Sequence, residues 1–220
     1  MEAATRSYGQ NCGLARSLDL LGQRWTLLVI RELARGPKRF RDLLTGLDGI
    51  GTNLLAARLK ALEATGVIER VILGAPAGVA AYALTDRGET LQPILEDLAL
   101  WGFDLVRPDE PDARTRAAWA AMSMRAHMDR SDGAPPDGLY EFSIGEERFW
   151  LRVAGGASQL RDGAAPLPPD LRVSTDLRTF LGVATGALDP AAPNLALEGD
   201  RRRARALFAA FRLPARPPAG

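Results

Sequence analysis

The 220-residue chain is short of the residues from which disulfides and metal sites are built. Cysteine and histidine occur once each, as Cys12 and His127. A single cysteine excludes an intramolecular disulfide and a cysteine-based zinc site, and the lone histidine has no second histidine or cysteine at ligand spacing. We therefore expect neither a metal centre nor another cofactor.

Long apolar runs and an excess of one charge are also missing. No stretch of about 18 apolar residues occurs, and the N-terminal sequence MEAATRSYGQ lacks a basic segment followed by an apolar one. We expect no membrane span, no signal peptide and a cytoplasmic location. The 28 basic and 27 acidic residues give a net charge of +1, which neither favours nor opposes nucleic acid as a partner. With 46% hydrophobic residues the chain can bury a core.

Sequence patterns of common catalytic sites do not occur. The chain contains no G-x-S-x-G, no phosphate-binding P-loop and no strand-initiated G-x-G-x-x-G. Its carboxylates are scattered, and no pair stands out as a general acid and base. We therefore predict that the protein is not an enzyme.

The chain divides where helical periodicity is interrupted. Prolines and charges cluster at 106–116, which predicts a linker at 107–112. The linker separates a first domain, 1–106, from a second domain, 113–220.

The first domain is predicted to contain helices and one hairpin. Apolar spacing predicts two helices, a short third helix in RFRDLLTGL and a fourth over 52–64. Strand-like runs at 67–73 and 79–85 predict a hairpin, and a closing helix is expected over 87–106. This order of elements is typical of a winged helix-turn-helix domain.

The helix predicted over 52–64 has one apolar face and one face of small polar and basic side chains. Leu55, Leu59 and Leu62 recur at helical spacing and should face the core. A helix that enters the major groove of DNA needs small side chains between the groups that read base edges. The alternative is an ordinary surface helix of a small helical domain.

We predict DNA contacts from this helix and from the basic turn before it. Asn53 suits a bidentate contact with adenine, and Ala56 suits contact with a thymine methyl group. The cations of the turn suit phosphates, with a solvated charged turn as the alternative. The predicted DNA-binding residues are Arg35, Lys38, Arg39, Arg41, Thr52, Asn53, Ala56, Arg58 and Lys60.

Three segments within residues 10–105 occur together and in order: NCGLARSLDLLGQRWTLLVIRELARGPKRFRDL, GIGTNLLAARLKALEATGVIERVI and YALTDRGETLQPILEDLALWG. This set resembles the HxlR family of transcriptional regulators. The resemblance implies a winged-helix, DNA-binding dimer with the dimer contact formed by terminal helices. It also implies that 52–60 is the recognition segment and 72–82 the wing. The wing sequence LGAPAGVAAY has no Lys or Arg, although wings of the family are often basic or polar.

Cys12 lies at the start of the first predicted helix, where backbone amides can lower the pKa of a thiol. Several HxlR-like regulators use a cysteine in this position to sense oxidants or electrophiles. The resemblance therefore makes Cys12 a candidate redox sensor. The alternative is a small buried apolar side chain beside a dimer helix.

The second domain contains LRVSTDLRTFLGVATGALDP followed by LALEGDRRRARAL, within 113–213. The order strand, helix, Thr-Gly, strand, Gly-Asp, helix resembles the C-terminal part of sterol-carrier-protein-like domains. The resemblance implies an apolar cavity that accepts lipids or other hydrophobic molecules. The candidate ligand-binding residues are Phe180, Leu181, Leu207, Phe208 and Phe211, with plain core packing as the alternative.

The last helix also carries an arginine cluster. Arg201, Arg202, Arg203 and Arg205 suit an acidic ligand or DNA, and a solvated helix face is the alternative.

Together these observations predict an α+β fold, with a winged helix-turn-helix domain followed by a sterol-carrier-like domain. The expected function is that of a homodimeric regulator, acting as a repressor, on an inverted-repeat operator in double-stranded DNA. The second domain would sense a hydrophobic small-molecule effector. The alternative, favoured by the neutral wing, is a hydrophobic-ligand or lipid-binding protein whose winged helix serves dimerisation.

Overall fold

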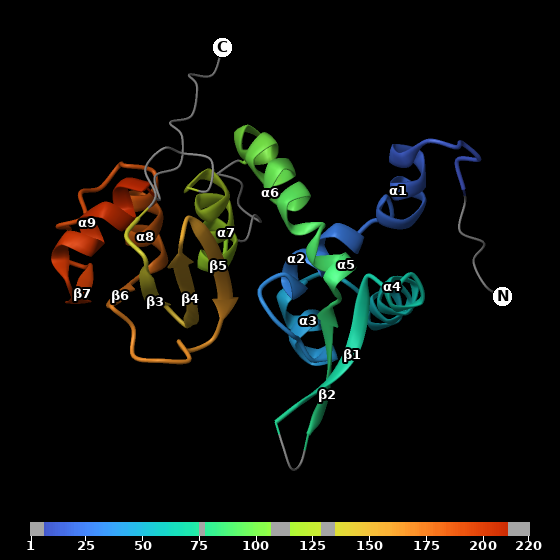
Figure 1. Cartoon of the computed structure of the whole chain (residues 1–220), viewed down its shortest axis with the longest axis horizontal. Coiled ribbons are helices and arrows are strands. Elements are labelled where there is room, and N and C mark those ends of the chain that lie inside the picture. The colour runs from blue at the N-terminus through green and yellow to red at the C-terminus, as the bar shows by residue number, and fades with distance from the viewer. Residues whose placement is uncertain (1–6, 75–77, 107–114, 129–134, 211–220) are drawn as a thin grey trace. The chain divides into compact units, whose positions relative to one another are not determined.

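The chain forms two compact units, an N-terminal unit ending at Leu95 and a C-terminal unit beginning at Glu96 (Figure 1). The computed structural model describes residues 7–74, 78–106, 115–128 and 135–210. The division between the units falls inside helix α6 (Gln92–Trp101). The predicted linker, 107–112, lies outside the described residues. Each unit buries its own cluster of apolar side chains.

The N-terminal unit has helices followed by a hairpin, in the predicted order. Its first elements are α1 (Gly13–Leu21), α2 (Thr26–Leu33), α3 (Phe40–Gly46), α4 (Thr52–Ala64), β1 (Ile68–Leu73) and β2 (Val79–Leu84). The strands are antiparallel. Lys38 and Tyr82 exchange backbone hydrogen bonds of 2.9 and 2.8 Å, which adds the turn before α3 to the hairpin. The predicted winged helix-turn-helix fold is confirmed.

The core of the N-terminal unit gathers around the apolar face of α4. Leu55, Leu59 and Leu62 are buried, as their spacing predicts, and they share a cluster with Val29 of α2. Gly66 follows α4 with a φ of 67°, a left-handed conformation that glycine adopts without a steric penalty. The buried stripe leaves the opposite face of α4 exposed.

The prediction of one continuous helix over 87–106 is wrong. The structure has a short helix α5 (Asp86–Glu89), then α6, then the 3-10 turn η1 (Gly102–Leu105). The interruption has a covalent cause, because Pro93 has no amide hydrogen to donate to the carbonyl of Glu89. Helix α6 restarts with this proline in its first turn, where the missing donor is tolerated.

The C-terminal unit is a mixed sheet packed against helices. Its elements are α7 (Ala117–Met128), β3 (Gly138–Ile144), β4 (Glu147–Ala154), β5 (Ala157–Asp162), β6 (Leu171–Thr175), α8 (Leu177–Ala184), β7 (Ala196–Gly199) and α9 (Arg201–Ala210). The strand order is β5-β4-β3-β6-β7. Strands β3 and β6 are parallel, and the other neighbours are antiparallel.

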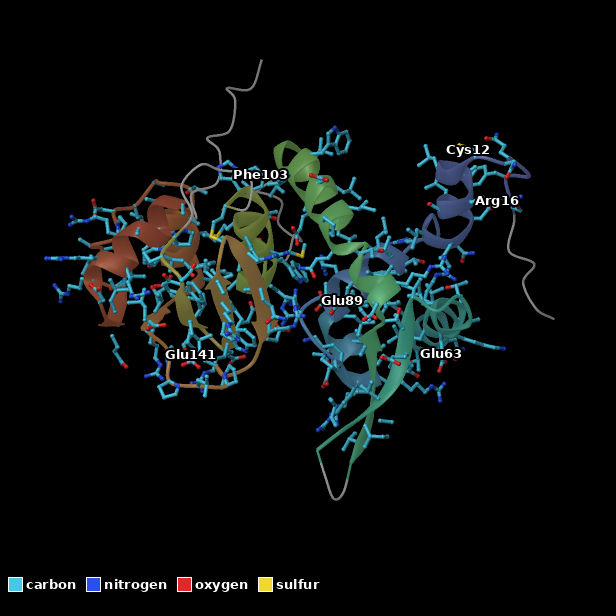
Figure 2. All side chains as sticks on the ribbon, viewed as in Figure 1. Cys12, Arg16, Glu63, Glu89, Phe103 and Glu141 are labelled. Carbon is cyan, nitrogen blue, oxygen red and sulfur yellow. The ribbon has the colours of Figure 1, made fainter. Side chains whose placement is uncertain are left out.

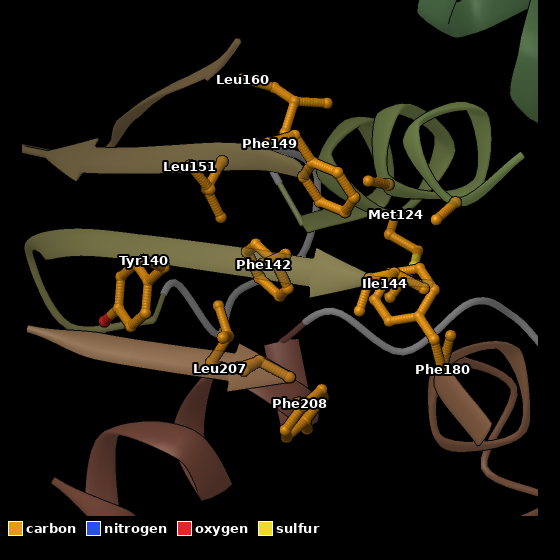
Figure 3. Close-up of a cluster of buried hydrophobic side chains, with 14 of the residues drawn as sticks. Met124, Tyr140, Phe142, Ile144, Phe149, Leu151, Leu160, Phe180, Leu207 and Phe208 are labelled. Atoms are coloured by element: carbon orange, nitrogen blue, oxygen red, sulfur yellow. The ribbon is translucent and has the colours of Figure 1, made fainter. Parts of the chain in front are cut away.

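Aromatic side chains fill the core of the C-terminal unit (Figure 3). The rings of Phe142 and Phe149 stack with centroids 5.0 Å apart, and Phe180 meets each of them edge-on at 6.2 Å. Leu207 and Phe208 of α9 belong to the same buried cluster. These side chains pack on one another between the sheet and the helices.

A buried carboxylate occupies the other face of the sheet. Glu141 of β3 is 1% exposed (Figure 2), and Arg148 and Arg172 donate hydrogen bonds of 2.8 Å to its Oε1. The amide of Ala165 donates to Oε2 at 2.8 Å. Burial opposes ionisation, but the hydrogen bonds from Arg148, Ala165 and Arg172 outweigh it and lower the pKa of Glu141 from 4.5 to about 2. The carboxylate thereby fastens the loop containing Ala165 to the sheet.

Candidate nucleic-acid interface

The exposed face of α4 carries four of the nine residues predicted to contact DNA. Thr52, Asn53, Ala56 and Lys60 are exposed, and they lie opposite the buried leucines. The face is therefore low in side-chain bulk, with one cation one turn beyond Ala56. A helix with this surface can approach base edges closely.

The first turn of α4 presents backbone donors. Gly51 is the N-cap residue and has extended backbone angles, with φ −76° and ψ 148°. No side-chain hydrogen bond caps this end of the helix. The first amides of a helix have no intrahelical acceptor, and they are suited to phosphate oxygens.

The turn before α3 holds cations in a fixed position. Arg39 and Arg41 are exposed, and Lys38 is half-buried. The backbone of Lys38 is bonded to Tyr82 of β2, and the amide of Arg39 donates to Asp42 Oδ2 at 3.1 Å. The structure thus places this basic turn and the exposed face of α4 in the same unit.

Arg35 does not belong to this surface, which corrects its prediction as a phosphate contact. Its side chain is 2% exposed and bonds to Glu32 Oε2 at 2.6 Å. Arg31 bonds to the other oxygen of Glu32 at 2.8 Å. Glu32 lies in the last turn of α2 and Arg35 lies just beyond the end of that helix, and the charge of Arg35 neutralises the buried carboxylate.

Arg58, also predicted to contact DNA, is less exposed than Lys60 and less buried than Arg35. It is half-buried, and its Nε donates to the carbonyl oxygen of Arg24 at 3.1 Å. This bond ties α4 to the segment between α1 and α2. Arg58 therefore orients the helix and is not one of the exposed cations of the face.

The described part of the wing carries little positive charge. Arg70 is the basic residue of β1 and β2, and it pairs with Glu63 at 3.1 Å and lies over the ring of Tyr82. Ile72 and Val79 are exposed near the end of the hairpin. Residues 75–77, between the strands, lie outside the described residues. The exposed sides of the described hairpin are mainly apolar.

Cys12 is exposed at the N-terminal end of α1 (Figure 2). The alternative, burial beside a dimer helix, would require a second chain to cover this side chain. Hydrogen bonds from the amides of Ala15 and Leu14 lower the pKa of the thiol below its usual value. An exposed thiol with a lowered pKa is more reactive at neutral pH than an ordinary cysteine.

The predicted ligand-binding residues lie in the packed core. Phe180, Leu207 and Phe208 are buried there, and Leu181 packs against the same cluster. Phe211 lies outside the described residues.

A pocket of about 620 Å³ lies elsewhere in the C-terminal unit, beside α9. Leu195, Leu197 and Ala204 line it together with Arg201, Arg205 and the loop 189–191. The alternation of Leu195 and Leu197 and the four-residue spacing of the arginines are the sequence signals that could have identified it.

No group of three His, Cys, Asp or Glu side chains suited to a metal ion occurs among residues 7–74, 78–106, 115–128 and 135–210. No helix within those ranges is long and apolar enough to cross a membrane.

Comparisons with known proteins find similarity in the N-terminal half of the chain. Residues 20–110 match the model of the HxlR-like helix-turn-helix family. The HTH-type transcriptional regulator YodB of Bacillus subtilis is 34% identical over 94 residues, which cover 43% of this chain and 84% of YodB. The HTH-type transcriptional regulator sll1512 of Synechocystis is 38% identical over 96 residues, covering 44% of this chain and 71% of that protein. The solved structure of reduced YodB covers 46% of this chain and 100% of its own, with 33% identity and a TM-score of 0.39.

Proposed function

The chain belongs to the HxlR-like helix-turn-helix family, and on that premise we propose that it represses transcription by binding an inverted-repeat operator. The observation that carries this proposal is the exposed face of α4. Thr52, Asn53 and Ala56 face the base edges, with Asn53 reading adenine and Ala56 contacting a thymine methyl group. Lys60 and the basic turn before α3 contact phosphates.

The test separates base reading from phosphate contact. Operator affinity is measured by fluorescence anisotropy on DNA from upstream of the protein's own gene, and on a scrambled duplex, over a series of salt concentrations. Asn53→Ala should weaken operator binding by about 1–3 kcal/mol and leave scrambled binding unchanged. Arg39→Ala should weaken both and reduce the salt slope by about one.

A matched control removes one exposed cation from the other unit. Arg178→Ala, on α8, should change neither affinity. Equal losses of operator and scrambled binding in Asn53→Ala would contradict its assignment as a base-reading residue.

Dimerisation is the second part of the proposal. Helix α1 exposes Leu14 and Leu18, while α6 and η1 expose Leu98, Trp101 and Leu105. Trp101 is 72% exposed in the single chain. Large exposed apolar side chains that cluster on one helix are typical of protein interfaces. A two-fold dimer would present two copies of α4 to half-sites about 34 Å apart, or a multiple of that spacing.

The C-terminal unit is proposed to sense a hydrophobic effector. Its elements β6, α8, β7 and α9 follow the order that resembles sterol-carrier-like domains. The pocket beside α9 supports the proposal, because its volume lies in the usual range for small-molecule sites. An effector changes DNA affinity only if it binds the two DNA-binding states unequally, and a tenfold preference corresponds to about 1.4 kcal/mol. The expected result is a change in operator affinity when a hydrophobic compound is added.

A second candidate function is ligand binding without DNA binding, with the winged helix used for dimerisation. The described hairpin favours it, because Arg70 is paired with Glu63 and exposed apolar side chains lie near the end of the hairpin. The same anisotropy experiment decides between the two. Operator affinity equal to that for the scrambled duplex at every salt concentration would support this alternative.

Oxidation or modification of Cys12 is an alternative to a hydrophobic effector as the signal that changes DNA affinity. The exposure of Cys12 and its lowered pKa favour it. Oxidant or quinone should then release the operator from the wild-type protein and not from Cys12→Ser. Release from both proteins would assign the response to another group.

A further inference from the structure

The pocket beside α9 combines an apolar floor with a basic rim. Its apolar lining consists of Leu195 and Ala204, which are buried, and Leu197, which is half-buried. Arg201 and Arg205, one turn apart on α9, line the pocket with exposed side chains. A site of this kind separates an apolar part of a ligand from a charged part.

The two rim arginines differ from Arg172 of the same unit, whose side chain is held by carboxylates. Arg172 pairs with Glu141 at 2.8 Å and with Glu198 at 2.9 Å. The side chains of Arg201 and Arg205, by contrast, form no hydrogen bond or ion pair with another described residue. Like charges one helical turn apart repel each other, and an anion bound between Arg201 and Arg205 would relieve this repulsion.

Asp189 is the carboxylate residue in the pocket lining, and it does not balance the charges of Arg201 and Arg205. Asp189 Oδ1 accepts a hydrogen bond of 2.7 Å from the amide of Ala191, within the loop that forms one wall. Asp189 therefore holds the loop in its turn. With one carboxylate and two guanidinium groups, the lining has a net positive charge.

We propose that this pocket binds an amphipathic anion. The apolar body lies on Leu195 and Leu197, and a carboxylate or phosphate head lies between Arg201 and Arg205. The guanidinium group forms paired hydrogen bonds to such heads, which makes arginine selective for them. The inference rests on the proposed sensing role of the C-terminal unit and specifies the chemical class of its effector.

The test is isothermal titration calorimetry of the full-length protein without DNA. The probes are decanoate and decan-1-ol, which share an apolar body and differ in the charge of the head. Decanoate should bind at least about tenfold more tightly than the alcohol, as expected for hydrogen bonds between charged groups. Arg201→Gln and Arg205→Gln should each remove most of this preference and leave the binding of decan-1-ol unchanged.

Two matched controls accompany these variants. Arg202→Gln removes the same charge from an exposed position of α9 that does not line the pocket, so it should leave decanoate binding unchanged. Ala191→Trp should fill the pocket and abolish binding of both probes, whereas Ala196→Trp, on β7 outside the lining, should not.

Several results would overturn the assignment. Equal affinity for decanoate and decan-1-ol, or an equal effect of Arg202→Gln, would show that the arginine pair does not select an anion. Binding to phosphatidylglycerol vesicles without binding of free decanoate would assign the surface to a membrane instead.

Measuring both decanoate binding and operator affinity tests the pocket assignment and the sensing role independently. Arginine-dependent decanoate binding with unchanged operator affinity would support the pocket assignment and refute sensing. A shift in operator affinity caused by decan-1-ol, and insensitive to both arginine substitutions, would support sensing and refute the anionic ligand class.

Discussion

Replacing Glu141 with glutamine should destabilise the C-terminal unit in a pH-dependent manner. The substitution keeps the shape of the side chain and removes its charge, while Arg148 and Arg172 remain beside it. The pKa of Glu141 falls from 4.5 to about 2 on folding. Because each pKa unit corresponds to about 1.4 kcal/mol, ionised Glu141 contributes about 3 kcal/mol to the free energy of unfolding.

The sign of the pH dependence follows from the lowered pKa. A carboxyl group with a lower pKa in the folded protein stabilises it fully above the unfolded pKa, 4.5 here. The contribution disappears as pH falls through the folded value of about 2. Glu141→Gln should therefore lose about 3 kcal/mol at pH 7, and its difference from wild type should shrink as the pH falls from about 4.5 towards 2.

Urea unfolding followed by circular dichroism, fitted for the two units separately, measures this difference at each pH. Glu198→Gln is the matched control, because Glu198 also pairs with Arg172 but its side chain is 70% exposed. Its loss should stay below about 1 kcal/mol. The reasoning is refuted if the two variants lose the same stability at pH 7, or if the loss in Glu141→Gln does not diminish in acid.

Three further predictions concern the other sites. Arg35→Ala should lower the free energy of unfolding of the N-terminal unit by about 1–3 kcal/mol, because the buried Glu32 loses one of its arginine partners and keeps Arg31; urea unfolding measures the loss. Iodoacetamide should alkylate Cys12 faster at pH 7 than it alkylates glutathione, because the pKa of Cys12 is lowered; an equal rate, by mass spectrometry, would contradict this. Trp101→Glu should weaken dimerisation measured by analytical ultracentrifugation, and an unchanged dissociation constant would exclude this part of α6 from the interface.

In the N-terminal unit, the sequence predicted the order of the elements and also which face of α4 is buried. The spacing of Leu55, Leu59 and Leu62 identified the buried side of α4, because apolar periodicity follows directly from helix geometry. The burial of Arg35 could not be predicted in the same way. Its position near Lys38 and Arg39 suggested a basic surface, and its partner Glu32 becomes relevant only when α2 is oriented on the core.

The C-terminal unit shows where the sequence is ambiguous. Leu207 and Phe208 of α9 were candidates for ligand binding or for core packing, and the structure buries both, but apolar periodicity alone cannot distinguish a packed core from the lining of a cavity. Strand β5 gave no clear signal, since Leu160 is its one large apolar residue. The fold of this unit depends on pairings between distant strands, such as β3 with β6, which local patterns do not specify.

The bridge between Lys38 and Tyr82 has a consequence for how this surface can evolve. Its hydrogen bonds join backbone groups, so they survive any side-chain replacement other than proline. The basic turn can therefore exchange its side chains through successive mutations while keeping its place next to the wing. A library randomised at positions 38, 39 and 41 should consequently yield mostly folded proteins, which makes this turn a practical place to adjust overall DNA affinity and its salt dependence.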